Sequence, residues 1–360
     1  MPLNHYVTVG RSGLRVSPFC LGAMTFGEDL GWGTTVKESE AILDRFIELG
    51  GNFIDTANVY TKGHSEKIIG DHIGRNKNKR DRLVIATKFS ANMYPGDPNG
   101  GGSNRKSIVG ALEQSLRRLQ TDYVDLYWLH NWDKNTPIEE TMAALDDLVS
   151  AGKVRYLGVS DTPAWKATQA QMIAQFRGWA PFIGLQVEYS LLERTVEGEL
   201  IPMALELGLG VTPWSPLKGG VLSGKYTRQN AKQVAPDRGW VAASLSENAF
   251  AVIDELQRIA RQLDTTVARV ALAWVQGRPG VASTIIGART LAHLEDNLKA
   301  LDVRLAPEQS AALDALTKPT LDFPAGFMPL FASSHAGGVT INGESPEPSP
   351  FNLTGDDKPY

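Results

Sequence analysis

The chain has 360 residues, enough for one large domain or two ordinary ones, with ample material for a hydrophobic core. Its hydrophobic content of 42%, charged content of 21% and net charge of −4 are typical of a soluble globular protein and give no reason to expect a nucleic acid or a membrane as a partner. The single cysteine, Cys20, excludes an intrachain disulfide and a cysteine metal cluster. Because we find neither a signal peptide nor an apolar run of membrane-spanning length, we expect a cytoplasmic protein.

The first predicted elements are a hairpin and a buried strand. Residues 6–9 and 14–16 flank a Gly-Arg-Ser-Gly turn, which predicts an N-terminal β-hairpin. Residues 19–22 then form the first predicted core strand. Residues 37–49 have apolar side chains at helical spacing and are followed by two glycines, which predicts a helix.

From residue 52 onward, short apolar strands alternate with helices. The predicted strands are 52–55, 83–88, 124–130, 154–160, 182–188, 210–214 and 282–286. The predicted helices are 64–74, 107–119, 137–151, one that begins near Pro163, 197–207, the segment 246–276 and 291–300. Together with the strand at 19–22 and the helix at 37–49, these make eight alternations over roughly 300 residues, which favours a closed (β/α)8 TIM barrel. The alternative is an open doubly wound sheet, but its Gly-x-Gly-x-x-Gly motif after the first strand is missing.

Two stretches depart from this alternation. Residues 92–104, rich in glycine and proline, predict a flexible loop after the strand that ends at Lys88. We therefore expect a barrel over residues 1–317 and a long irregular C-terminal tail over residues 318–360. The tail is either a frayed terminus or a lid or oligomer arm. Its apolar residues favour the second reading: Phe323, Phe327, Met328, Leu330 and Phe331.

Reactive side chains stand at the ends of three predicted strands. Asp55, Lys88 and His130 are the last residues of their strands, and Tyr60 follows the first of them closely. Each alone is more often structural, as a salt bridge, a satisfied core histidine or a loop aromatic. In a barrel, however, the carboxyl ends of all strands meet at one mouth. A carboxylate, an ammonium, an imidazole and a phenol that converge there predict proton transfer.

The neighbouring ammonium is expected to change the acidity of the phenol. A free phenol, with a pKa of about 10, is a poor acid at neutral pH. An ammonium about 4 Å away, at an effective dielectric constant of about 20, contributes roughly 4 kcal/mol, or about three pK units. We therefore expect Lys88 to lower the pKa of Tyr60, with Asp55 keeping Lys88 charged. His130 would hydrogen-bond and orient the oxygen that is being protonated.

Motifs across residues 7–316 resemble the aldo-keto reductase superfamily, in family order and at family spacing. They are residues 51–60, the strand that ends at Lys88, and residues 125–130, 158–161, 186–190, 213–220 and 286–290. Within the superfamily the chain looks most similar to the branch of aryl-alcohol dehydrogenases and potassium-channel β subunits. The resemblance implies a catalytic tetrad of Asp55, Tyr60, Lys88 and His130, with the tyrosine as proton donor in reduction.

The resemblance also implies a nicotinamide cofactor across the mouth, without a Rossmann fold. Ser160, Asp161 and Gln186 would hold the carboxamide, and Trp214 would stack on the ring. An arginine at position 289 would pair with a 2′-phosphate, so NADP(H) is expected over NAD(H). The whole implied cofactor set is Ala23, Met24, Asp55, Ser160, Asp161, Gln186, Trp214, Ser215, Pro216, Leu217, Gly219, Lys225, Gly287, Arg289, His293, Asp296 and Asn297.

Two positions depart from the family pattern. Position 161 is Asp where the family usually has Asn, and a carboxylate accepts a hydrogen bond from an amide NH2 but cannot donate one. His293 replaces the usual Gln near the adenosine phosphate. A protonated imidazole there would aid binding of the 2′-phosphate and make it sensitive to pH.

The expected function is that of an NADP(H)-dependent oxidoreductase that interconverts aldehydes or ketones and alcohols. The partner would be a small molecule, with no metal, no nucleic acid and no membrane, and a homo-oligomer is possible. One alternative is an NADPH-binding regulatory subunit with slow turnover. Another is a barrel glycosidase, which needs two carboxylates at the mouth, and only Asp55 and Asp161 are candidates.

Loops around the mouth would set the substrate. They are residues 27–34, 92–104, 131–132, 225–240 and the tail. Their side chains Trp32, Tyr94, Asn131 and Trp132 form the predicted substrate pocket, which favours aryl or bulky alicyclic carbonyls.

Overall fold

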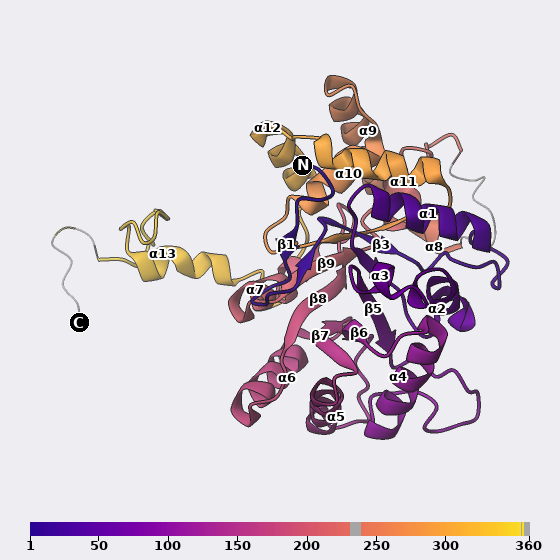
Figure 1. Cartoon of the computed structure of the whole chain (residues 1–360). Coiled ribbons are helices and arrows are strands. Elements are labelled where there is room, and N and C mark those ends of the chain that lie inside the picture. Colours follow the sequence, from indigo (N-terminus) through magenta and orange to yellow (C-terminus); the bar gives the residue numbers. More distant parts are fainter. Residues whose placement is uncertain (231–238, 354, 356–360) are drawn as a thin grey trace.

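The structure, a computed structural model, describes residues 1–230, 239–353 and 355. At its centre is a barrel of eight parallel strands with helices around it (Figure 1). The strands are β3 (Phe19–Gly22), β4 (Phe53–Asp55), β5 (Val84–Phe89), β6 (Val124–Leu129), β7 (Val154–Ser160), β8 (Phe182–Glu188), β9 (Gly210–Trp214) and β10 (Thr284–Gly287). The predicted (β/α)8 barrel is confirmed.

The barrel closes through two different junctions. On one side β10 pairs with β3 in parallel, from Thr284 opposite Phe19 to Gly287 opposite Gly22. On the other side the segment just before β10 meets β9 at Val211, whose amide donates to the Gly280 carbonyl (2.9 Å) and whose carbonyl accepts from the Ala282 amide (2.9 Å). This second junction is the weak seam of the barrel.

The predicted N-terminal hairpin is present and closes the end of the barrel opposite the mouth. Its strands β1 (Val7–Thr8) and β2 (Arg15–Val16) pair antiparallel. Val9 and Val16 are fully buried in the same cluster as Trp128, a residue of β6. The Trp128 indole fits because its neighbours on β7 and β8 are glycines: a Cβ at Gly158 would lie 2.2 Å from it, and one at Gly184 3.0 Å. One large side chain thus fills the barrel axis below the mouth.

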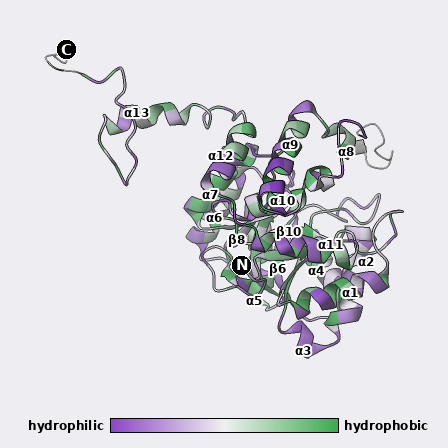
Figure 2. Cartoon of the chain, turned by 90° about the horizontal axis from the view of Figure 1, so that it is seen from above, coloured by the Kyte–Doolittle hydropathy of each residue, from purple (hydrophilic) through white to green (hydrophobic). Residues whose placement is uncertain are grey.

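Amphipathic helices surround the strands. They are α1 (Val36–Glu48), α2 (His64–Ile69) with a π-helical turn (Gly70–Gly74), α4 (Arg105–Leu119), α5 (Ile138–Ser150), α6 (Ala164–Arg177), α7 (Leu200–Leu207), α9 (Glu247–Gln262), α10 (Val267–Gln276) and α11 (Leu291–Leu298). On α1 the buried residues Ile42, Leu43 and Phe46 lie on one face, and Figure 2 shows the outer helices carrying both hydrophilic and hydrophobic residues. These faces pack on the barrel.

Three short helices and one longer one were not predicted. They are α3 (Lys77–Arg80), α8 (Gly239–Ala243), α12 (Pro307–Leu316) and α13 (Phe331–Ala336). Helix α12 has Pro307 in its first turn, and Leu313 is its one buried residue, so the apolar periodicity that would predict it is absent. No helix in the described part of the chain is long and apolar enough to span a membrane.

The C-terminal tail extends from the barrel instead of folding back over it (Figures 1 and 2). It was predicted to be irregular, but α13 and a 3₁₀ turn (Met328–Leu330) interrupt it. The rings of Phe323, Phe327, Phe331 and His335 follow one another at centroid distances of 6.1, 5.1 and 6.0 Å. Side chains four residues apart lie on one face of a helix. The glycine and proline content of the tail predicted irregular structure, so this spacing was not recognised in the sequence.

Candidate active site

Strand register places the predicted reactive residues on the inner face of the barrel mouth. Lys88 of β5 is level with Trp128 of β6, which is level with Gly158 of β7. Trp128 fills the axis, so Lys88 at the same level also points inward. Side chains alternate along a strand, so Ser160 and Gln186, two residues beyond the glycines that Trp128 contacts, point inward as well. The mouth is therefore lined by polar side chains directly above an apolar interior.

Lys88 is the centre of a buried hydrogen-bond network. Its ammonium donates to a carboxylate oxygen of Asp55, to the Thr56 carbonyl (2.8 Å) and to the Tyr60 hydroxyl (3.1 Å), which uses all three of its N–H donors. The other oxygen of Asp55 accepts from the Gln186 amide at 3.2 Å. The acid, the amine and the phenol of the predicted tetrad are therefore in direct contact.

His130 completes the cluster from the other side of the phenol. It lies one residue beyond β6, and its ring meets the Tyr60 ring edge-on, with centroids 6.0 Å apart and planes at 82°. Burial, followed by the nearby Lys88 charge, lowers the pKa of His130 to about 3. The imidazole is therefore neutral at physiological pH, so one ring nitrogen can donate a hydrogen bond and the other can accept one.

The expected lowering of the Tyr60 pKa is wrong for the ligand-free protein. Burial raises the pKa of Tyr60 above its usual value, and the attraction of the Lys88 charge only partly offsets that effect. The prediction counted the ammonium but could not count the loss of water around the phenol. Burial alone would lower the pKa of Lys88, but Asp55 and Tyr60 outweigh it, so that pKa is raised and Lys88 is charged as expected.

Next to the tetrad, the structure contains an unsatisfied polar group. The hydroxyl of Ser160 is buried and makes no hydrogen bond of normal geometry within the described residues, although it lies near enough to the Asp161 carboxyl to lower the pKa of that group. A buried hydroxyl without a partner costs free energy, so it fits a ligand that supplies one. Gln186 is beside it in strand register. A hydroxyl and a carboxamide at this spot suit an amide-bearing ring such as nicotinamide.

Asp161 lies at the edge of the same spot in a strained backbone conformation. Its φ is +40°, in the left-handed region that aspartate tolerates better than most residues. The Trp214 indole donates to its carboxylate at 3.1 Å. Burial raises the pKa of Asp161, opposed by the Trp214 hydrogen bond. Asp161, predicted to hold the carboxamide, and Trp214, predicted to stack on the nicotinamide ring, are thus directly linked.

The loop after β9 turns its backbone through several left-handed residues. Ser215, Lys218, Gly219 and Gly220 all have positive φ, and the Gly219 amide donates to the Ser215 hydroxyl at 3.1 Å. The Lys218 and Gly220 amides also donate within the turn, to the Ser215 carbonyl (2.8 Å) and the Leu217 carbonyl (2.9 Å), so these three amides already have partners. Lys225, which ends the loop, is exposed. Pro216 is buried and Leu217 half-buried beneath this turn, so they support the loop.

Residues predicted for the adenosine end gather around the start of α11. Thr290 caps this helix by accepting from the His293 amide, and Arg289 precedes the cap. Within the described residues the Arg289 guanidinium makes no ion pair. Asp296, in contrast, already binds Arg269 (3.0 Å), and Asn297 donates to the Gly287 carbonyl (3.1 Å). Arg289 is thus available for an anion, whereas Asp296 and Asn297 have structural partners.

Two further residues of the predicted cofactor set lie after β3. Ala23 is buried, and its amide donates to the Asp55 carbonyl at 2.8 Å, so it fixes the backbone under the tetrad. Met24 is 48% exposed.

The predicted substrate residues have different surroundings. Trp32 is half-buried and Asn131 exposed. The hydroxyl of Tyr94 reaches Gln114 on α4 (2.6 Å). Trp132 packs edge-on against Trp165, a residue of α6 that the sequence interpretation missed, with centroids 5.4 Å apart. Of the predicted loop 225–240, residues 231–238 lie outside the described residues.

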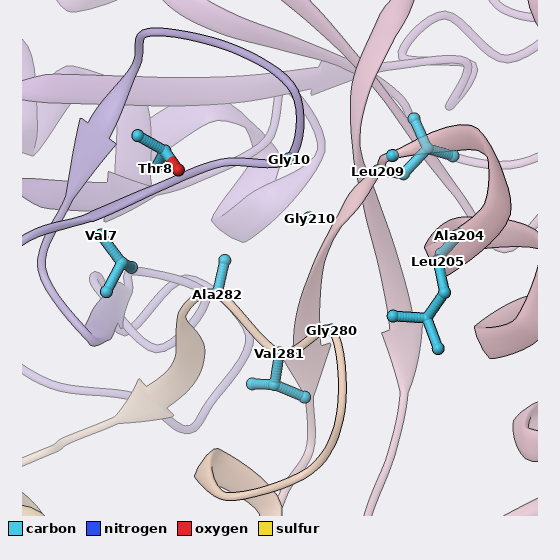
Figure 3. Close-up of a pocket in the computed structure, with 11 residues that line it drawn as sticks. Val7, Thr8, Gly10, Ala204, Leu205, Leu209, Gly210, Gly280, Val281 and Ala282 are labelled. Carbon is cyan, nitrogen blue, oxygen red and sulfur yellow. The ribbon is translucent and has the colours of Figure 1, made fainter. Parts of the chain in front are cut away.

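Two pockets lie near the hairpin, at the end of the barrel opposite the mouth. One, of about 310 Å³, is lined by Val7, Thr8, Gly10, Ala204, Leu205, Gly208, Leu209, Gly210, Gly280, Val281 and Ala282, beside the seam (Figure 3). The other, of about 330 Å³, contains Arg11 and Trp179. Neither contains a tetrad residue. No group of three potential metal ligands occurs within the described residues.

Comparison with known proteins agrees with this geometry. The sequence model of the aldo/keto reductase family matches residues 18–318. An uncharacterized oxidoreductase, YrpG, of Bacillus subtilis is 39% identical, covering 84% of this chain and 93% of its own. Norsolorinic acid reductase of Aspergillus flavus is 34% identical, covering 90% and 84%. An aryl-alcohol dehydrogenase [NADP(+)] of Phanerodontia chrysosporium is 36% identical, covering 88% and 85%. The chain is an oxidoreductase that belongs to the aldo/keto reductase family.

Proposed function

We propose that the protein is an NADP(H)-dependent oxidoreductase that interconverts aldehydes or ketones and the corresponding alcohols, with aryl or bulky alicyclic carbonyls favoured. The observation that carries the proposal is the hydrogen bond of 3.1 Å between the Lys88 ammonium and the Tyr60 hydroxyl, with Asp55 bonded to the same ammonium. A half-buried phenol held by a cation can give up a proton and remain stabilised as phenolate. The names of the aryl-alcohol dehydrogenase relatives support the substrate class.

Each member of the cluster has a separate task in reduction. Tyr60 gives its proton to the carbonyl oxygen, and Lys88 stabilises the phenolate that remains. Neutral His130 donates a hydrogen bond that orients the same oxygen. Asp55 keeps Lys88 charged and in place. A bound nicotinamide would supply the hydride in reduction and accept it in alcohol oxidation.

The preference for NADP(H) over NAD(H) rests on charge at the adenosine end. Arg289 has no ion-pair partner in the described part of the chain and precedes the α11 helix, whose N-terminus favours anions. Lys225 adds an exposed cation. The relative named for NADP(+) supports this preference. Arg289→Gln is expected to weaken NADPH binding and leave NADH binding unchanged, measured by cofactor fluorescence.

The test of the proposal is NADPH consumption with 4-nitrobenzaldehyde, comparing the native protein with Tyr60→Phe. We expect sustained turnover that the substitution reduces by about 10²- to 10⁴-fold, the usual contribution of a positioned acid. NADPH binding should be unchanged, since only the hydroxyl is removed. Tight binding of NADPH with a single turnover would instead favour the regulatory-subunit alternative, and equal rates for both proteins would remove Tyr60 from the mechanism.

A further inference from the structure

A cluster of two tryptophans and a lysine stands on the barrel rim beyond the tetrad. The rings of Trp132 and Trp165 are 5.4 Å apart and nearly perpendicular, at 80°. The ammonium of Lys166 lies 4.6 Å from the Trp165 ring centre and 5.6 Å from that of Trp132. We call these three residues the Trp–Lys rim.

The Trp–Lys rim lies at the mouth because of where its two segments leave the barrel. Trp132 comes two residues after His130, so their Cα atoms are at most about 7 Å apart. Trp165 and Lys166 are in the first turn of α6, which begins four residues after the mouth end of β7. Both segments therefore start from neighbouring strands at the level of the tetrad, next to His130.

The lysine of the rim is held but not neutralised. Its ammonium donates to the Gln169 side chain at 2.7 Å, and within the described residues it makes no ion pair with a carboxylate. The nearest acid in the Trp132 loop, Asp133, instead accepts from the Ser103 amide (3.0 Å) and the Thr136 hydroxyl (2.6 Å). Lys166 thus keeps N–H donors for a ligand.

The tryptophans supply the aromatic part of the same site. Trp165 is 58% exposed, which leaves much of a large indole surface in water. Indole faces bind aromatic rings through offset or edge contacts and also hold the lysine in position. A fixed cation beside exposed indole surface matches a ligand that is aromatic and carries a negative charge.

We propose that the Trp–Lys rim selects aryl carbonyl substrates that carry a carboxylate on the ring. With the carbonyl at Tyr60 and His130, a ring substituent opposite it points away from the tetrad, and the rim begins two residues after His130. Lys166 then pairs with the carboxylate while Trp132 and Trp165 contact the ring. This inference rests on the proposed function, since it concerns the substrate of the same site.

The test compares 4-carboxybenzaldehyde with methyl 4-formylbenzoate, which has the same ring and carbonyl but no charge. For the native protein we expect kcat/KM to be about 3- to 10-fold higher for the acid, as for a partly exposed ion pair, and to fall toward that of the ester as salt is added. Lys166→Gln should remove this preference, so that its kcat/KM values for the acid and the ester agree within about 2-fold. Lys134→Gln, an exposed lysine of the Trp132 loop, is the matched control and should change neither.

The outcomes separate the inference from the proposed function. If the ester is reduced but the acid is not preferred, or if Lys134→Gln acts like Lys166→Gln, the inference is wrong and the reductase stands. If neither aldehyde is reduced, the proposed function fails, and calorimetric binding of terephthalate still decides the inference. Binding that Lys166→Gln weakens by about 3-fold or more supports it, and equal or absent binding overturns it.

Discussion

The Lys88 ammonium donates to three oxygen atoms at the mouth, and these bonds set the charge of the residues around it. Tyr60 stays a neutral phenol because its burial outweighs the attraction of Lys88 for a phenolate. His130 stays neutral because burial and the same cation both disfavour imidazolium. The site is therefore prepared to donate a proton at neutral pH, with a hydrogen-bonding imidazole beside it.

This arrangement predicts the pH dependence of the two reaction directions. Reduction requires protonated Tyr60, whose pKa is raised, so kcat/KM for an aldehyde should be flat between about pH 5 and 9 and fall only above that range. Alcohol oxidation requires the phenolate, so its kcat/KM should rise with pH over the same range. Rate profiles in both directions test this. A reduction rate that already falls near pH 7 would contradict the assignment of Tyr60 as the acid.

His130 predicts a second effect of pH, on stability. The unfolded chain protonates this imidazole below about pH 6.5, whereas the folded protein keeps it neutral down to about pH 3. The unfolded state binds more protons in this window, so acid favours unfolding. At pH 4.5 the native protein has lost roughly 2–3 kcal/mol of unfolding free energy relative to pH 7. His130→Asn lacks this penalty. In urea titrations, its unfolding free energy minus that of the native protein should therefore rise by about the same amount between pH 7 and pH 4.5. Parallel pH curves would refute the buried neutral imidazole.

At the scale of elements, apolar runs bounded by turn residues predicted strands β3, β7, β8 and β9 with the bounds that the structure has. The β5 strand runs one residue past Lys88, because Phe89 continues the apolar run and pairs with Leu129. Convergence of the tetrad was predictable, since parallel strands share one mouth. The hydrogen bond from Lys88 to the Thr56 carbonyl and the raised pKa of Tyr60 could not be predicted, because both depend on packing. Trp165 and Lys166 were missed because nothing in α6 alone pairs them with Trp132.

The glycines under the mouth predict how tightly the barrel interior is packed. A Cβ at Gly158 would lie 2.2 Å from the Trp128 ring, so Gly158→Ala forces the indole or strand β7 to shift. We expect a loss of about 1–3 kcal/mol of unfolding free energy, as for an overpacked core. Gly110→Ala in α4 is the control: nothing lies within 4 Å of its added methyl, and it should stabilise by about 0.5–1 kcal/mol. Urea unfolding midpoints of both variants test this prediction. If Gly158→Ala left the unfolding free energy unchanged, the barrel interior would be packed more loosely than the structure shows.

At the scale of the whole molecule, the barrel and the tail differ in how they pack. Thr317 accepts a hydrogen bond from Arg194 at 2.8 Å, and after it Leu321 and Ala325 still lie beside Gly198. Beyond it the tail extends from the barrel, with Phe323 82% and Phe351 92% exposed (Figure 1). This arrangement fits a frayed terminus or an oligomer arm better than a lid over the mouth.

Removal of residues 319–360 should therefore leave catalysis largely intact. We expect kcat/KM for 4-nitrobenzaldehyde within about 3-fold of the native value, because the tetrad and its partners lie before Thr317. Light scattering on the same samples measures the molecular mass. It therefore separates the loss of an oligomer from the loss of a tail that covers the mouth. A drop of more than about 10-fold at unchanged molecular mass would show that the tail closes over the mouth.

In the proposed reaction, a hydride passes at this mouth from a nicotinamide to a carbonyl carbon while Tyr60 protonates the oxygen. The most direct measurement is a single turnover with NADPH carrying two deuterium atoms at C4, followed by mass and NMR analysis of the alcohol. We predict one deuterium on the carbinol carbon of each product molecule, and almost none formed in the same time by Tyr60→Phe. Alcohol without deuterium, or equal transfer by the variant, would contradict the claim.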